Sequence, residues 1–210
     1  VYITDGTAAG TVLVKDIYAG ASSSFPQNLT NVNGVLYFRA YDATNGQELW
    51  KSDGTAVGTV LVKDIYAGAT GSFPQYLTNV NGVLYFNAQD VTNGLELWKS
   101  NGTGAGTTIV KDIIPGAGSS FPYYLTFCNS KLIFNAADND HGYELWTSDG
   151  TNTGTTLVKD INTYSDGSNA GFWYKGVGST GDAVVFDAFT PSLGSELYKS
   201  DGTPAGTVLL

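Results

Sequence analysis

Short apolar stretches alternate along the whole chain with clusters of glycine, asparagine, aspartate and serine. Between residues 75 and 112 these stretches are rich in branched and aromatic side chains, and they fall at 75–80, 83–88, 95–100 and 107–112. This composition predicts β-strands, and no stretch of ten residues shows a helical period. Residues 83–86 and 60–62 are apolar on both alternating faces, so we expect sheets that are covered on both sides.

Turn-forming sequences separate the predicted strands. Asn81-Gly82 lies between the first and second strands, and this pair favours a type I′ hairpin because both central residues must take positive φ. Between the third and fourth strands, the motif Asp-Gly-Thr-x-x-Gly-Thr supplies a side chain that caps a turn and two glycines for a tight reversal. The pattern therefore predicts antiparallel meanders of four strands.

This four-strand pattern repeats. The Asp-Gly-Thr motif begins at residues 5, 53, 101 (as Asn-Gly-Thr), 149 and 201, with a spacing of about 48 residues that lengthens to about 52 before the last copy. A tandem unit of this length is typical of propeller blades, which cover one another's faces. A parallel β-helix or a set of stacked sandwiches is the competing architecture.

We therefore predict an all-β fold, a β-propeller of four-stranded antiparallel blades with about four and a half blades in one repeat domain, residues 1–210. The expected units are a partial blade at 1–17 and blades near 25–65, 73–113, 121–161 and 172–210. A half blade leaves unpaired strand edges. We expect that further blades outside this segment, a second chain or an irregular fifth blade completes the ring.

The repeated motif resembles that of the ELWxxDGT repeat family. Residues 48–55 read Glu-Leu-Trp-Lys-Ser-Asp-Gly-Thr, and the motif recurs at 96–103, at 144–151 and, with tyrosine in place of tryptophan, at 196–203. The resemblance covers essentially the whole chain. It implies a bacterial secreted or cell-surface protein of propeller type, with no established enzymatic activity.

The composition limits the classes of partner that we expect the chain to bind. The net charge of −9 disfavours nucleic acid, because binding to phosphates requires lysine and arginine. No apolar run is long enough for a membrane-spanning helix. The single cysteine, Cys128, has no partner for an intramolecular disulfide, and we expect it to be a small buried apolar residue. The single histidine, His141, is expected in a solvated turn, so no nucleophile–histidine pair is predicted.

Most acidic residues stand at repeated positions, which indicates structural roles. We expect the aspartates of the Lys-Asp-Ile motif, at 16, 64, 112 and 160, to cap turns. The glutamates at 48, 96, 144 and 196 stand among apolar neighbours in mid-strand and need partners there. We expect ion pairs with the lysines at 63, 111 and 159, and a ring of metal-bound carboxylates is the alternative.

The loop between the second and third strands is the best candidate for binding, because loops on a rigid scaffold carry function disproportionately. Its polar residues are Asp42, Asn45, Asp90, Asn93, Asp138 and Asp140. The spacing of Asp138, Asp140 and Gly142 is similar to the start of a calcium loop, which makes the two aspartates weak metal candidates and calcium a possible cofactor. A plain turn is the alternative.

A second set of candidates is aromatic. Tyr76 and Tyr124 belong to a group of aromatic residues near Gly/Ser-rich links, a composition suited to stacking on sugars or to packing between blades. We therefore expect a non-catalytic extracellular or cell-surface propeller that acts as a binding or adhesion scaffold for a glycan or protein ligand. One alternative is a structural protein that assembles into homo-oligomers or filaments by completing blades between chains. The other is a carbohydrate-active enzyme domain.

Overall fold

The computed structural model describes residues 1–164, 167–170, 178–179 and 181–210, and these residues form strands, turns and loops without a helix. The strands make four four-stranded antiparallel sheets and one hairpin. The N-terminal hairpin contains β1 (Tyr2–Ile3) and β2 (Val12–Leu13). Sheet 1 contains β3 (Gln27–Val32), β4 (Val35–Asp42), β5 (Gly46–Ser52) and β6 (Val60–Lys63), and sheet 2 contains β7 (Gln75–Val80), β8 (Val83–Asp90), β9 (Gly94–Ser100) and β10 (Thr108–Lys111). Sheet 3 contains β11 (Tyr123–Cys128), β12 (Lys131–Asp138), β13 (Gly142–Ser148) and β14 (Thr156–Lys159), and sheet 4 contains β15 (Gly178–Ser179), β16 (Val184–Thr190), β17 (Gly194–Ser200) and β18 (Val208–Leu209).

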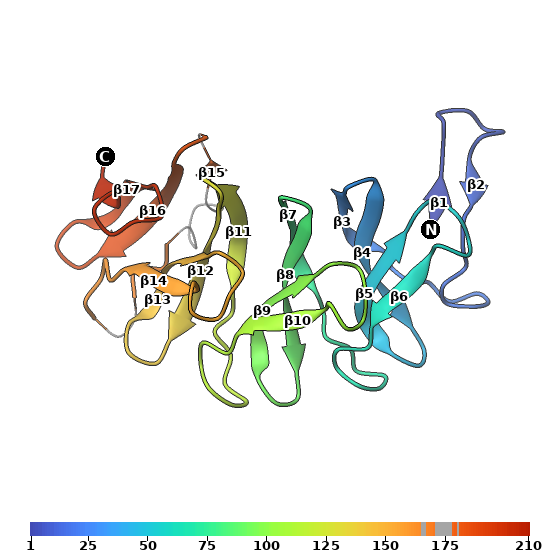
Figure 1. The fold of residues 1–210 in the computed structure, drawn as a ribbon, viewed down its shortest axis with the longest axis horizontal. Coiled ribbons are helices and arrows are strands. Elements are labelled where there is room, and N and C mark those ends of the chain that lie inside the picture. Colours follow the sequence, from blue (N-terminus) through green and yellow to red (C-terminus); the bar gives the residue numbers. More distant parts are fainter. Residues whose placement is uncertain (165–166, 171–177, 180) are drawn as a thin grey trace.

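The sheets stand side by side in an open arc, with the N-terminal hairpin at one end and sheet 4 at the other (Figure 1). The strands of each sheet follow chain order, so each sheet is a meander. The first strands of neighbouring sheets contact one another, β3 with β7, β7 with β11 and β11 with β15. The architecture is therefore all-β and similar to a propeller, and the sheets are not closed into a ring.

The hairpin turns have the predicted geometry. Asn81 and Gly82 take φ values of 50° and 86°, as a type I′ turn requires. Sheet 3 makes the same turn without glycine, and Asn129 and Ser130 take φ values of 50° and 61°. A serine with a left-handed backbone conformation is uncommon. We attribute it to the pairing of β11 with β12, which holds the turn in place.

The Asp-Gly-Thr link also behaves as predicted. The Asp53 carboxylate accepts hydrogen bonds from the backbone N–H of Thr55 at 2.9 Å and from its hydroxyl at 2.7 Å. Gly54 takes a φ of 89°, which is open to glycine at little cost. The Thr55 hydroxyl in turn accepts the N–H of Gly58 at 2.9 Å, which closes the reversal between β5 and β6.

The hydrophobic core lies between neighbouring sheets. Leu49 of sheet 1 packs in one cluster with Phe86 and Trp98 of sheet 2, and Leu49 and Phe86 are fully buried. Burial of one such side chain contributes about 2 kcal/mol. The prediction of sheets covered on both sides is confirmed for these internal interfaces. Cys128 is a free thiol, 2% exposed, in the cluster between sheets 3 and 4, so its expected role as a small buried residue is confirmed.

The predicted strand positions agree closely with the structure. In sheet 2 the first strand has the predicted bounds, the second continues two residues further to Asp90, and the third starts one residue earlier at Gly94. The predicted start of the last unit at residue 172 lies outside the described residues. Within the described part of the chain, no helix has the length and apolarity needed to cross a membrane.

Candidate functional site

Buried glutamates join each sheet to the loop that leads into the next one. Glu48 on β5 is fully buried, and its carboxylate accepts hydrogen bonds from the Ser72 N–H at 2.8 Å and the Ser72 hydroxyl at 2.5 Å. The N–H of Tyr66 donates to the same carboxylate at 3.0 Å. Glu96 with Ser120, and Glu144 with Ser168, repeat this arrangement, which we name the Glu–Ser contact.

The predicted ion pairs between these glutamates and the repeated lysines are wrong. Lys63 instead donates to the backbone carbonyl of Thr107 in the next sheet at 2.8 Å, and its ammonium lies 5.7 Å from the centre of the Trp98 ring. The register explains the difference, because Lys63 is directly opposite Leu49. Neighbouring residues of a strand point to opposite faces, so Lys63 and Glu48 lie on opposite faces of sheet 1.

The glutamates have strongly altered acidities. Burial raises the pKa of Glu96 to about 7, although hydrogen bonds from Ser120, Ile113 and Ile114 lower it. Burial in the same way raises the pKa values of Glu48 and Glu144 to about 7. Because these carboxyls repeat in every internal interface and are enclosed there, we assign them to holding the sheets together.

The aspartates of the Lys-Asp-Ile motif cap turns, as predicted, in three copies. Their carboxylates accept the N–H of the glycine four residues later, with distances of 3.2, 3.3 and 3.0 Å from Asp16 to Gly20, Asp64 to Gly68 and Asp112 to Gly116. The fourth, Asp160, precedes a loop that lies partly outside the described residues.

The predicted binding residues of the loop between the second and third strands hold their own turns. The carboxylate of Asp42 accepts the N–H groups of Thr44 and Asn45 at 2.8 and 2.7 Å, and the Asn45 amide donates to both of its oxygens. Asp90 and Asn93 form a similar arrangement in sheet 2, in which the Asn93 amide donates to one carboxylate oxygen. The three loops are separate copies in three sheets, so the predicted residues do not converge on one centre.

In sheet 3 a histidine takes the place of the asparagine. His141 Nδ1 lies 2.8 Å from an Asp138 oxygen, and the N–H groups of Asp140 and His141 donate to the other oxygen. The hydrogen bond to Asp138 raises the pKa of His141. Burial raises the pKa of Asp138, but the hydrogen bonds from His141 and Asp140 outweigh it and leave that pKa below its ordinary value.

Calcium binding at Asp138 and Asp140 stays a prediction. Among the described residues, no group of three or more histidine, cysteine, aspartate or glutamate side chains is arranged to hold a metal. Both Asp138 oxygens already accept hydrogen bonds within the turn. A cation there would have to replace these contacts.

The predicted aromatic residues pack across the interface between sheets 2 and 3. The Tyr76 ring lies 5.5 Å from the ring of Tyr123 and 5.7 Å from that of Tyr124, measured between centroids. Tyr76 and Tyr124 take φ values of 54° and 57°, which are strained for a tyrosine. Contacts between rings at these distances stabilise the interface, and the packing role accounts for both residues.

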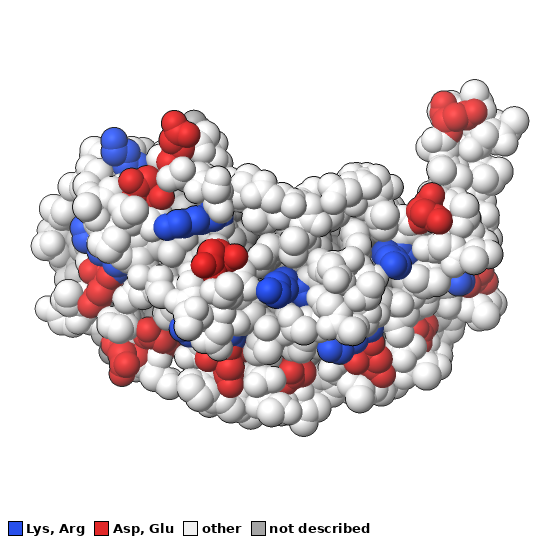
Figure 2. All heavy atoms as spheres, viewed as in Figure 1, with Lys and Arg blue, Asp and Glu red and all other residues white. Residues whose placement is uncertain are grey.

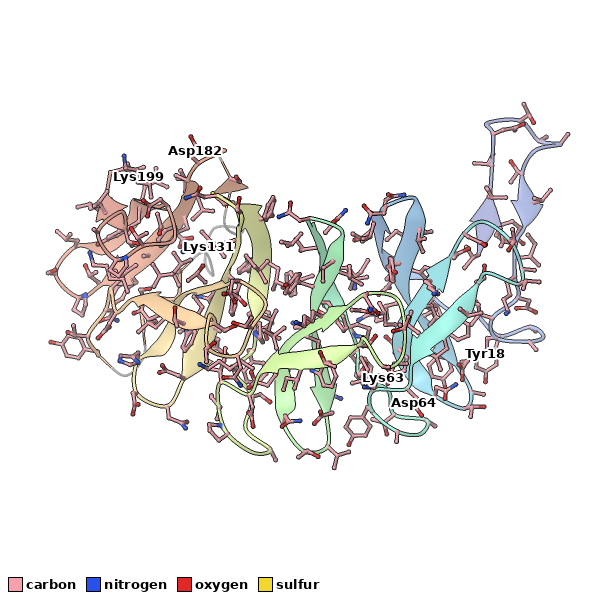
Figure 3. All side chains as sticks on the ribbon, viewed as in Figure 1. Tyr18, Lys63, Asp64, Lys131, Asp182 and Lys199 are labelled. Carbon is pink, nitrogen blue, oxygen red and sulfur yellow. The ribbon has the colours of Figure 1, made fainter. Side chains whose placement is uncertain are left out.

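A different aromatic pair lies on the surface of sheet 1. Tyr18 and Tyr41 stack nearly parallel, with 5.4 Å between ring centroids and 13° between ring planes. Tyr18 borders two hollows, one of about 400 Å³ beside Asp42 and Asn45 and one of about 460 Å³ beside Tyr41 and Gln47. Figure 3 shows Tyr18 near the N-terminal end of the arc. The structure thus brings two of the predicted loop residues next to an aromatic platform.

Sequence reasoning missed Tyr41, although a signal was present. The corresponding residues in the other three sheets are Gln89, Ala137 and Phe189, so only sheet 1 combines a tyrosine here with one at position 18. A pair that occurs in one copy of a repeat serves no need common to all copies. This difference between copies marks it as a candidate site.

Comparison with known proteins shows likeness in fold alone. No protein-family profile and no curated protein sequence matches the chain. Among solved structures, it is similar to a puromycin hydrolase mutant complexed with PGG (TM-score 0.63, 12% identity) and to a puromycin-hydrolyzing peptidase of Mycobacterium tuberculosis (0.55, 13%). Oligopeptidase B from Leishmania major is similar at 0.53 and 12%. The matches cover 96%, 96% and 99% of this chain but 30% of each of those proteins, within their β-propeller domains.

Proposed function

We propose that this chain is a propeller-type scaffold of a secreted or cell-surface protein, and that it binds a glycan without catalysis through the Tyr18–Tyr41 platform. The observation that carries the proposal is the stacked pair beside two hollows, which among the described residues occurs in one copy of the repeat. The resemblance to the ELWxxDGT repeat family supports the location. The propeller-like fold supports a scaffold role, because rigid sheets position surface loops.

The platform has the chemistry of a sugar site. Flat aromatic faces pack against the apolar C–H face of a pyranose ring, and a few polar groups at the edge fix its orientation. Here Ser22, Ser23 and Gln47 surround one hollow, and Asp42 and Asn45 border the other. The serine hydroxyls and the Gln47 amide supply both donors and acceptors for sugar hydroxyls, whereas Asp42 and Asn45 already bind each other in their turn.

The negative charge of the protein indicates which kind of glycan should bind. The protein carries a net charge of −9, and acidic residues lie along the lower edge of the arc (Figure 2). Asp42 borders one of the two hollows directly. An acidic surface repels anions, so neutral or amino sugars should bind more tightly than sialylated or sulfated ones.

The non-catalytic part of the proposal rests on what the acidic residues do. The buried glutamates hold the interfaces between sheets, and the aspartates Asp42, Asp90 and Asp138 accept hydrogen bonds inside their own turns. Glycoside hydrolysis needs two carboxyls that face each other across a substrate. At the Tyr18–Tyr41 platform, Asp42 is the only acidic residue among those bordering the two described hollows.

A glycan array followed by titration of the best sugar tests the proposal. We expect Tyr18→Ala to weaken binding at least about fivefold, since one stacked ring contributes about 1 kcal/mol or more. Tyr66→Ala is the matched control, because Tyr66 occupies the equivalent position of sheet 2 and should leave binding unchanged. Binding should persist in a chelator. An array without bound sugar, equal loss in both variants, or dependence on calcium would contradict the proposal.

A further inference from the structure

A hollow of about 210 Å³ lies between sheets 2 and 3, which stand in the middle of the arc (Figure 1). Its borders include Asn81, Val83 and Tyr85 of sheet 2 and Ser130, Ser148 and Asp149 of sheet 3. None of these residues borders the two hollows beside Tyr18. The hollow is therefore separate from the Tyr18–Tyr41 platform.

A serine in place of a glycine keeps this hollow open. At the interface between sheets 1 and 2, the amide nitrogen of Asn33 lies only 2.6 Å from the place that a Cβ on Gly82 would take. Asn81 and Ser130 are the counterparts of this pair one interface later. Because Ser130 has a Cβ, Asn81 does not fold over it in the same way and stands at the border of the hollow instead.

Asp149 gives the hollow a negative charge. One of its carboxylate oxygens accepts the hydroxyl and the N–H of Thr151 at 2.7 and 2.8 Å, and these hydrogen bonds lower the pKa of Asp149. The second oxygen accepts no hydrogen bond from any residue in the described part of the chain. Burial raises the pKa of Tyr85 and the charge of Asp149 raises it further, so the carboxylate acts on a hydroxyl at the border of the hollow.

The two positions held by Val83 and Asp149 differ from one interface to the next. Between sheets 1 and 2 their counterparts are Val35 and Asn101, which carry no charge. Between sheets 3 and 4 the counterparts have opposite charges, because Lys131 and Asp201 stand there. Of these three interfaces, the one between sheets 2 and 3 alone combines an acidic residue with a valine.

The interface between sheets 3 and 4 contains an ammonium group of its own. Lys131 belongs to sheet 3 (Figure 3), and its Cδ lies 3.8 Å from the place that a Cβ on Gly202 of sheet 4 would take. Hydrogen bonds from Thr203 lower the pKa of Asp201, and the ammonium of Lys131 lowers it further. The fold therefore accommodates a lysine side chain beside the aspartate of this turn.

We propose that the hollow between sheets 2 and 3 binds a primary alkylammonium group supplied by a ligand. This group takes the place that the Lys131 side chain occupies one interface later. Its N–H groups donate to the second oxygen of Asp149 and to the hydroxyl oxygen of Ser130 or Tyr85. Its alkyl chain packs against Val83, which removes apolar surface from water.

The lysines of the protein near this turn do not border the hollow. Lys99 donates to the Gly150 carbonyl at 2.9 Å, and Lys131 adds to the lowering of the Asp149 pKa that the hydrogen bonds from Thr151 cause. Neither side chain is among the residues that border the hollow. The net charge of −9 also favours a cationic ligand over an anionic one.

An NMR titration of the 210-residue chain with n-butylammonium chloride tests the proposal. We expect saturable shifts of the backbone N–H signals of Ser130 and Gly150. Asp149→Asn should weaken binding at least about tenfold, the effect of losing a hydrogen bond to a charged group. This variant should fold, because Asn101 forms the same turn in sheet 2 and accepts the N–H and hydroxyl of Thr103 at 3.0 and 2.8 Å.

The matched control is Asp201→Asn, which makes the same change in the turn of sheet 4 and should leave binding unchanged. Val83→Lys gives the interface a lysine like Lys131 and should abolish binding of n-butylammonium. Ser130→Gly should also abolish it, because Asn81 is then free to fold over the glycine as Asn33 folds over Gly82.

Two further probes define the ligand. n-Butanol has the same alkyl chain without the charge and should not bind. If the lysine derivative Nα-acetyl-lysine N-methylamide binds more tightly than n-butylammonium, the site recognises a lysine of a protein, whereas equal affinity indicates a free amine. The proposal would be overturned by the absence of saturable shifts, by equal binding to Asp149→Asn and the wild type, or by binding of n-butanol. Tyr18→Ala should leave this binding unchanged, so the result is independent of the glycan site.

Discussion

Raising the pH from 5 to 8 should destabilise the protein through the buried glutamates, and Glu96 shows why. Its pKa is raised from 4.5 to about 7 by burial. At pH 5 the folded state therefore holds a proton that the unfolded chain has largely released. Stability from this group is fully present below pH 4.5 and is lost as the pH rises to about 7.

The size of the effect follows from the shift. The difference between 4.5 and about 7 is about 2.5 pKa units, which corresponds to about 3 kcal/mol at 1.36 kcal/mol per unit. Domains are commonly stable by about 5–15 kcal/mol, so one such glutamate changes the unfolding midpoint visibly. The pKa values of Glu48 and Glu144 are raised as well. The whole molecule should therefore lose more stability with rising pH than Glu96 alone accounts for.

Urea unfolding followed by tryptophan fluorescence at pH 5 and pH 8 measures this loss, with Glu96→Gln as the matched variant. Glutamine keeps the size and accepts the Ser120 N–H but does not ionise. Because part of the effect is already lost at pH 5, the variant should lose about 2.5 kcal/mol less than the wild type between the two pH values. The hydrogen bond to Asp138 raises the pKa of His141, and this residue is the same in both proteins, so it contributes equally to both. If the free energy of unfolding changed with pH by the same amount in the wild type and in Glu96→Gln, the reasoning would be refuted.

Three further substitutions, one of them paired with a rescue variant, test the packing and the turns by thermal melting. Gly150→Ala should be strongly destabilising, because its Cβ would lie 2.0 Å from the Tyr85 hydroxyl, and Tyr85→Phe should partly restore it; no recovery would place the strain elsewhere. Lys111→Met should cost about 2 kcal/mol by leaving the Thr155 carbonyl without its charged donor, and an unchanged melting temperature would contradict that role. Gly34→Ala should cost only about 1 kcal/mol, since open space surrounds it and only its φ of 85° is unfavourable; a larger loss would show a hidden contact.

The strands and turns were predictable because their causes are local. The branched residues of 75–80 and the pair Asn81-Gly82 determine the hairpin whatever surrounds it. The open shape of the arc was harder to predict from the sequence. Whether the sheets close into a ring depends on the rotation between neighbouring sheets. Many contacts at each interface determine this rotation together, so no single sequence motif predicts it.

The partner of the buried glutamates illustrates what spacing alone does not reveal. Glu48 and Lys63 stand on neighbouring strands, which made an ion pair plausible. A register in which Lys63 is opposite Leu49 puts the two charges on different faces, and a bulge between Leu49 and Trp50 adjusts that register. The true partner, Ser72, lies 24 residues away in a loop. Side chains of loops carry no periodic signal that would reveal this contact.

Comparison of the copies within the chain separates structural from functional positions. The second strand of every sheet has an alanine that is fully buried in the structure, at positions 40, 88, 136 and 188. The next position along the strand varies from tyrosine to glutamine, alanine and phenylalanine. Because packing between sheets imposes the same requirement on each copy, a residue that departs from its counterparts is free of that requirement. Tyr41 is such a residue, and its contact with Tyr18 is therefore where a specific ligand should be sought first.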